Sequence, residues 1–78
     1  MPRFFFHVYD DLIVDDQEGR ELPDVNAARE TAMNEARVLM CETLRRGRIT
    51  LSHRIEVFDE AGERVAVVPF GDAVIIEQ

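Results

Sequence analysis

The stretch from Pro23 to Gly47, PDVNAARETAMNEARVLMCETLRRG, decides the fold because it carries a helix together with its two end signals. Asp24 is a preferred residue at a helix N-cap, and glycine is the residue that most often follows a last helical turn. Between these signals the apolar residues recur at helical spacing, at positions 25, 28, 32, 33, 36, 39, 40 and 44. The pattern predicts one helix over residues 25–46, about 33 Å long at 1.5 Å per residue.

The segment before the helix predicts a β-hairpin. Residues 3–9, RFFFHVY, are rich in aromatic and β-branched side chains, which favour a strand. Because side chains alternate along a strand, Phe4, Phe6 and Val8 are expected to point one way and Phe5, His7 and Tyr9 the other. Residues 12–22 are expected to form the returning strand, interrupted at residues 15–19, where Gly19 suits a turn.

The segment after the helix predicts a second hairpin. Strands are expected at residues 53–59 and 64–70, joined by a loop that contains Gly62. The order ββαββ predicts an α+β, two-layer fold: an antiparallel sheet with one long helix packed on one face, in a single domain over residues 1–78. The residues expected to be most buried are Phe6, Val8, Ala32, Leu39, Ile55 and Val57.

Several short motifs resemble a known family. They are MPRFFFH at the start, ELPD before the helix, AAR in its first turns, and RIEV followed by DEAG in the second hairpin. In this order and spacing they are similar to the short bacterial proteins grouped as domain of unknown function 6894, from Met1 to about Val74. The resemblance implies no activity, because the family has no established one.

Composition excludes several classes of protein. The formal net charge is −7, and an acidic protein is repelled by nucleic-acid phosphates and by anionic membranes. Nucleic acid is therefore an improbable partner and no membrane association is expected. The longest apolar run, residues 73–76, is far too short to cross a bilayer, and the first residues hold no signal-peptide core, so a cytoplasmic location is expected. The single cysteine, Cys41, cannot form an internal disulfide.

No motif for catalysis or for a cofactor is visible. His7 and Asp10 would lie on opposite faces of a strand, so they do not form a metal site with Asp11 or His53. The acidic stretch from residue 10 also fails as a calcium loop, because its sixth residue is Asp15 instead of glycine. We therefore expect no cofactor. An enzyme or a metal-binding protein remains the third hypothesis, behind two kinds of binding protein.

The first hypothesis is a non-catalytic module that binds a protein partner or forms a homodimer. It uses the sheet face turned away from the helix, and the expected interface residues are Phe5, His7, Tyr9, Phe58 and Val68. The alternative is a regulator that binds a ligand or nucleic acid through a basic patch at the end of the helix. The candidate residues of that patch are Arg37, Arg45, Arg46, Arg48 and Arg54.

Overall fold

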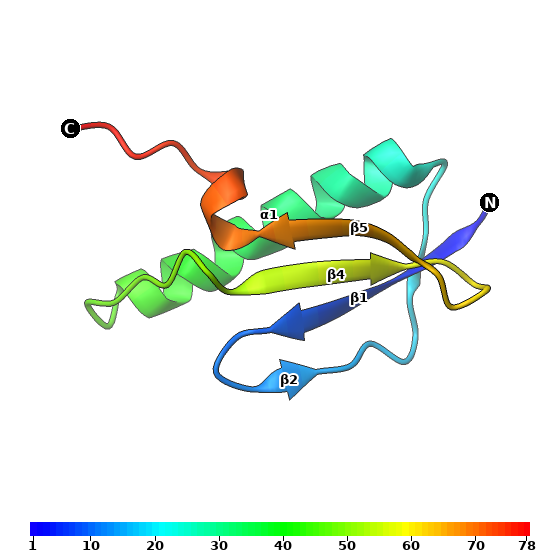
Figure 1. Ribbon diagram of the computed structural model, residues 1–78, viewed down its shortest axis with the longest axis horizontal. Helices are drawn as coiled ribbons and strands as arrows, with labels where there is room; N and C mark the ends of the chain where they lie inside the picture. The colour runs from blue at the N-terminus through cyan, green and yellow to red at the C-terminus, as the bar shows by residue number, and fades with distance from the viewer.

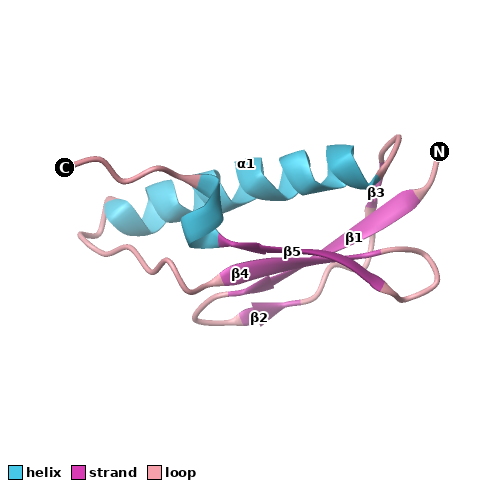
Figure 2. Ribbon diagram, turned by 45° about the horizontal axis from the view of Figure 1, so that its top comes forward, coloured by secondary structure: helices cyan, strands magenta, loops and turns pink.

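A computed structural model describes residues 1–78 and confirms the α+β fold (Figure 1). Its elements are β1 (Arg3–Tyr9), β2 (Ile13–Val14), β3 (Arg20–Glu21), α1 (Val25–Leu44), β4 (Arg54–Phe58), β5 (Arg64–Pro69) and the short 3₁₀ helix η1 (Phe70–Ala73). All strand pairs are antiparallel, in the order β2-β1-β4-β5, with β3 paired to the start of β1. The helix lies on one face of this sheet (Figure 2).

The expected strand over residues 12–22 is two short strands. β2 pairs with the end of β1, where Val8 lies opposite Val14, and β3 pairs with its start, where Phe4 lies opposite Arg20. Between these pairs, five residues of the returning chain, 15–19, stand opposite three residues of β1. The two extra residues cannot stay in the ladder, and the chain leaves it as a loop that ends at Gly19, with φ at +71°.

The helix begins where the sequence predicts and ends two residues earlier. The Asp24 carboxylate accepts a hydrogen bond from the Ala27 N–H at 2.8 Å, which caps the first turn. After Leu44, the N–H groups of Arg46 and Arg48 both donate to the carbonyl of Thr43. This tightened turn ends the helix before Arg46, and Gly47, with φ at +85°, redirects the chain.

The core lies between the sheet and the alanine stripe of α1. Ala28, Ala32 and Ala36 are fully buried, and their small side chains let the helix approach the sheet closely. The complete core is Phe4, Phe6, Ala28, Ala32, Ala36, Met40, Ile55, Val57, Ala66, Val68, Phe70 and Ala73.

Four of the six residues expected to be most buried belong to this core, and two do not. Val8 and Leu39 are half-buried and pack against its margin. The position of the helix explains Val8: α1 packs chiefly over β4, β5 and η1, and leaves the helix-side face of β1 and β2 partly uncovered (Figures 1 and 2). Met40, one position along the helix from Leu39, fills the core in its place.

The expected outward position of Val68 is wrong. Val68 lies opposite Ile55 in the ladder and is 1% exposed, so it faces the helix, whereas Val67 lies opposite Glu56 on the other face. The pairing of Ile55 with Val68 is regular, and because Ile55 faces the helix, Val68 faces it too; the register irregularity of this ladder lies farther along, between Val57 and Phe58. Phe70, which follows β5, is buried because η1 turns it back toward α1.

Candidate functional site

The most exposed run of apolar side chains in the sheet lies on its short edge strand. Leu12, Ile13 and Val14 are 74%, 68% and 54% exposed. β2 pairs only with β1, so its other side is a free sheet edge. We call residues 12–14 the β2 edge. Ile13 lies opposite Tyr9 and shares the outward face, whereas Val14 lies opposite Val8 and shares the helix side.

A groove runs beside the β2 edge on the helix side of the sheet. Its volume is about 510 Å³. Phe6, Val8, Val14 and Ile55 supply its apolar lining, the loop of residues 15–20 forms one wall, and Glu35 of α1 contributes to the other. The groove exists because α1 is offset toward β5 and leaves the helix-side face of β1 partly uncovered. A partly apolar hollow bordered by polar groups is the usual form of a binding site.

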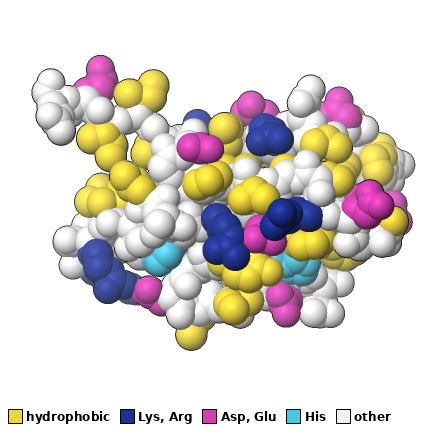
Figure 3. Space-filling view, viewed as in Figure 1, with side chains coloured by type: hydrophobic (Ala, Val, Ile, Leu, Met, Phe, Trp, Pro, Cys, Tyr) yellow, Lys and Arg dark blue, Asp and Glu magenta, His cyan; other side chains and the backbone are white.

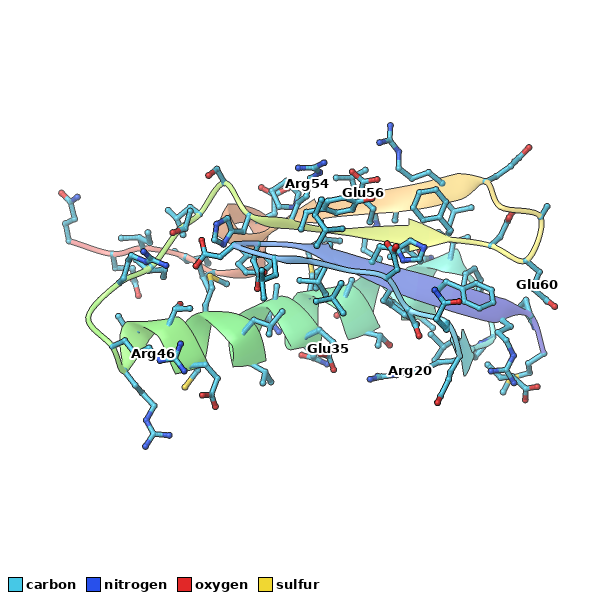
Figure 4. The ribbon with its side chains drawn as sticks, turned by 90° about the horizontal axis from the view of Figure 1, so that it is seen from below. Arg20, Glu35, Arg46, Arg54, Glu56 and Glu60 are labelled. Atoms are coloured by element: carbon cyan, nitrogen blue, oxygen red, sulfur yellow. The ribbon has the colours of Figure 1, made fainter.

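One ion pair links the loop to the helix across the groove. Arg20 Nη2 lies 3.2 Å from Glu35 Oε1, and its guanidinium carbon lies 5.8 Å from the centre of the Phe6 ring. Figure 4 shows the side chains of Arg20 and Glu35 reaching toward one another between β3 and α1. This ion pair joins the two walls of the groove.

Asp16 holds the loop in place. Its carboxylate accepts hydrogen bonds from the N–H groups of Phe6, Glu18 and Gly19, each at 3.1 Å. The Phe6 N–H has no strand residue opposite it at the break between β2 and β3, so the carboxylate takes that place. Burial opposes ionisation of Asp16, but the three donors and nearby His7 outweigh it and lower the pKa of the carboxyl.

His7 completes the support of the loop from the outward face. Its Nδ1 accepts a hydrogen bond from the Asp16 N–H at 3.0 Å and lies 3.6 Å from the Asp15 carboxylate. Its ring packs against Phe58 with the ring centres 5.0 Å apart. The Nδ1 atom is thus occupied by a backbone donor, and no group of three or more acidic, histidine or cysteine side chains is arranged to hold a metal ion.

The comparisons with known proteins identify a family and nothing more specific. The sequence profile described as "Domain of unknown function (DUF6894)" matches residues 3–71. The chain belongs to this family. No curated protein and no solved structure matches the chain. None of its helices is long and apolar enough to span a membrane.

In this DUF6894 member, the outward face of the sheet carries the aromatic residues expected there. Phe5 lies opposite Phe58 in the ladder, and both share this face with His7 and Tyr9, each side chain being half-buried. Val68, the fifth expected residue, lies in the core instead.

An ion-pair network lies among these aromatic residues. Glu56, only 6% exposed, accepts a hydrogen bond from Arg54 Nε at 2.7 Å and lies 3.6 Å from Arg64. The hydrogen bond from Arg54 lowers the pKa of Glu56. Burial opposes this shift, and the positive charges of Arg54 and Arg64 add to it. Arg54 also stacks over Tyr9 at 4.4 Å. In Figure 3, basic side chains flank an acidic one in the middle of an apolar surface. The side chains of this network therefore already cover part of the aromatic surface on the outward face.

The five arginines expected to form a basic patch do not gather on one surface. Arg54 lies on the outward sheet face, whereas Arg46 lies near the far end of α1, as Figure 4 shows. Arg37 donates to the Ala73 carbonyl at 2.7 Å, and Arg48 pairs with Asp11 at 2.6 Å. Only Arg45 joins Arg46 and Arg48 at the helix end. The expected patch is divided because Arg37 lies within α1 and Arg54 lies on β4, away from the end of the helix.

The sequence-based reasoning missed the β2 edge. It treated residues 12–14 as the beginning of an ordinary returning strand. A signal was present: the apolar run LIV is only three residues long and is bracketed by Asp10-Asp11 and Asp15-Asp16. Such a run is too short to extend a buried strand, and its acidic neighbours keep it at the surface.

Proposed function

We propose that the chain is a non-catalytic protein-interaction module that binds its partner through the β2 edge and the adjacent groove. The observation that carries this proposal is the exposure of Leu12, Ile13 and Val14, each more than half accessible, at a strand whose outer side has no neighbouring strand. An exposed apolar edge is a template for pairing with another chain, and proteins usually protect such an edge or use it. The groove beside it offers a partner further apolar surface.

The state of the titratable groups supports a binding role over catalysis. Asp16 is engaged by three backbone donors, and Glu56 is engaged by two arginines. His7 Nδ1 is engaged by the Asp16 amide. The lowered pKa values of both carboxyls make their carboxylates weaker bases than usual, and the hydrogen-bond donors already engage the oxygens that a general base would use. These groups stabilise the loop and the sheet.

A partner protein is better supported than a second copy of the chain. The outward aromatic face, which a homodimer would use, is half-buried and partly covered by the network of Arg54, Glu56 and Arg64. Pairing of two β2 edges would bring the aspartates of both copies together, and opposed like charges destabilise strand pairs. Light scattering behind a sizing column tests this point directly: we expect the 9.0 kDa monomer at micromolar concentration.

Site-specific crosslinking tests the interaction surface in the producing cell. A photoreactive benzophenone side chain is placed at position 13, and a matched control carries it at position 38. Val38 is 59% exposed on α1, so the two positions are similarly accessible and differ in surface. We expect a discrete crosslinked product from position 13 and none from position 38. Equal products from both positions, or none from position 13, would contradict the proposal.

A further inference from the structure

The backbone of the β2 edge is arranged to receive another strand. The Asp10 N–H donates to the Leu12 carbonyl at 3.3 Å, and Ile13 lies opposite Tyr9 in the ladder. In an antiparallel pair, residues alternate between positions that bond to the neighbouring strand and positions that do not. Leu12 bonds toward β1, so Ile13 directs its N–H and carbonyl away from β1, toward the free edge at the border of the sheet (Figure 1).

The side chains at this edge divide between two apolar surfaces. Val14 faces the groove, where Val8, Phe6 and Ile55 continue the apolar lining. Ile13 faces the outward side beside Tyr9. A strand added to β2 would place successive side chains alternately on these two sides. Apolar residues at alternate positions of such a strand would enter the groove, and the intervening ones would lie along Ile13.

The surroundings of the edge and the groove are acidic. Six carboxylates belong to this region: Asp10, Asp11, Asp15, Asp16, Glu18 and Glu35. Three arginines lie in the region: Arg20 pairs with Glu35, Arg48 pairs with Asp11, and Arg46 lines a second hollow together with Asp11 and Arg48. The region therefore has a formal charge of −3 (six acidic groups less three basic ones). Asp10 precedes the apolar run and Asp15 follows it, so negative charge stands at both ends.

From the backbone, the side chains and the charge together, we infer that the partner is an extended segment of another protein with apolar residues at alternate positions and lysine or arginine at both ends. It adds to the sheet as a strand beside β2. Main-chain hydrogen bonds supply its affinity, and the groove and the flanking aspartates supply its specificity. This inference rests on the proposed function and names the partner class for the same surface.

The test uses the full ¹⁵N-labelled chain and three synthetic peptides. The probe is the nine-residue peptide KKVTVTVKK. The first control replaces its four lysines with glutamate, and the second replaces the central valine with proline, which removes a main-chain donor. We expect the lysine peptide to shift the amide resonances of residues 12–14 and of Val8, with an affinity that falls as salt is added. The glutamate and proline peptides should bind roughly tenfold more weakly or not at all.

A pair of double variants tests the charge assignment. In Asp10→Asn with Asp15→Asn, the side chain at position 10 keeps an oxygen that can accept the hydrogen bond from the Leu12 N–H, so the hairpin is retained while two charges are removed. The matched control, Glu42→Gln with Glu63→Gln, removes the same charge at exposed positions outside the region. We expect the first pair to weaken binding of the lysine peptide about tenfold and the control pair to leave it within about twofold.

The other outcomes separate the inference from the proposed function. Equal affinity for the lysine and glutamate peptides overturns the basic partner class, and shifts confined to the outward face around Phe58 overturn the site. Self-association that Ile13→Asp abolishes makes a second copy the occupant, which overturns this inference and preserves an interaction role for the β2 edge. Absence of peptide binding overturns the inference alone if position 13 still crosslinks to a partner, and both proposals if it does not.

Discussion

Replacing Gly19 with alanine should destabilise the protein more than the same change at any other glycine with positive φ. Gly19 has φ at +71°, and a Cβ atom there would lie 2.8 Å from the Phe4 carbonyl oxygen. It would also lie 2.9 Å from a side-chain carbon of Arg3 and 2.9 Å from the Phe5 ring. Ordinary contact begins at 3.4 Å, so the loop and β1 must separate by at least about 0.6 Å, the difference between 3.4 and 2.8 Å.

The expected magnitude has two parts. The left-handed conformation costs an alanine about 1–2 kcal/mol relative to glycine. Crowding against a backbone atom in a packed position adds about 1–3 kcal/mol. We therefore expect Gly19→Ala to lower the free energy of unfolding by about 2–5 kcal/mol in total. For a domain of this size, each 1 kcal/mol lowers the melting temperature by about 4–8 °C.

Gly62→Ala is the matched control. Gly62 has φ at +82° and no atom within 4 Å of an added Cβ, so this variant reports the cost of the conformation alone. Thermal and urea unfolding followed by circular dichroism measure both variants against the parent. Gly19→Ala should melt at a clearly lower temperature than Gly62→Ala. If the two variants melt within a degree or two of each other, the close contact between the loop and β1 is wrong.

Three further predictions concern the core, the strand faces and acid stability. Phe6→Ala should cost about 3–5 kcal/mol in urea unfolding, and a near-parental midpoint would exclude Phe6 from the core. Val68→Asp should unfold the chain while Val67→Asp leaves it folded, by circular dichroism; equal effects would contradict the observed register. The pKa values of Asp16 and Glu56 are lowered, so their stabilisation should be complete above their ordinary values of 3.8 and 4.5 and decline as pH falls through the lower values of the folded state. Acid titrations of Asp16→Asn and Glu56→Gln should each show a weaker decline than the parent, and an unchanged curve would contradict that residue's role.

The elements governed by local signals were predictable from the sequence. The helix follows from Asp24, the spacing of its apolar residues and Gly47, whose effects act within a few residues. The two faces of β1 follow from simple alternation. Phe4 and Phe6 are buried, and Phe5 lies on the outward side as expected.

The features that depend on long-range geometry were not predictable in this way. The break between β2 and β3 depends on the Asp16 carboxylate reaching the Phe6 N–H, ten residues away. The inward position of Val68 depends on its pairing with Ile55 in the neighbouring strand. The groove depends on the offset of α1 toward β5. The sequence of the helix alone does not determine over which strands of the sheet it packs.

Because a loop interrupts the strand opposite β1, β2 can detach from the sheet independently of the other strands. β2 is joined to β1 over two residue pairs, and the loop of residues 15–19 separates it from β3, so its detachment leaves the pairing of β1 with β4 intact. A segment of this kind opens at a free energy below that of global unfolding. Hydrogen–deuterium exchange should therefore be fast at Val14 and slow at Ile55 in the same molecule. The chain can thus exchange one edge strand for another without melting its core.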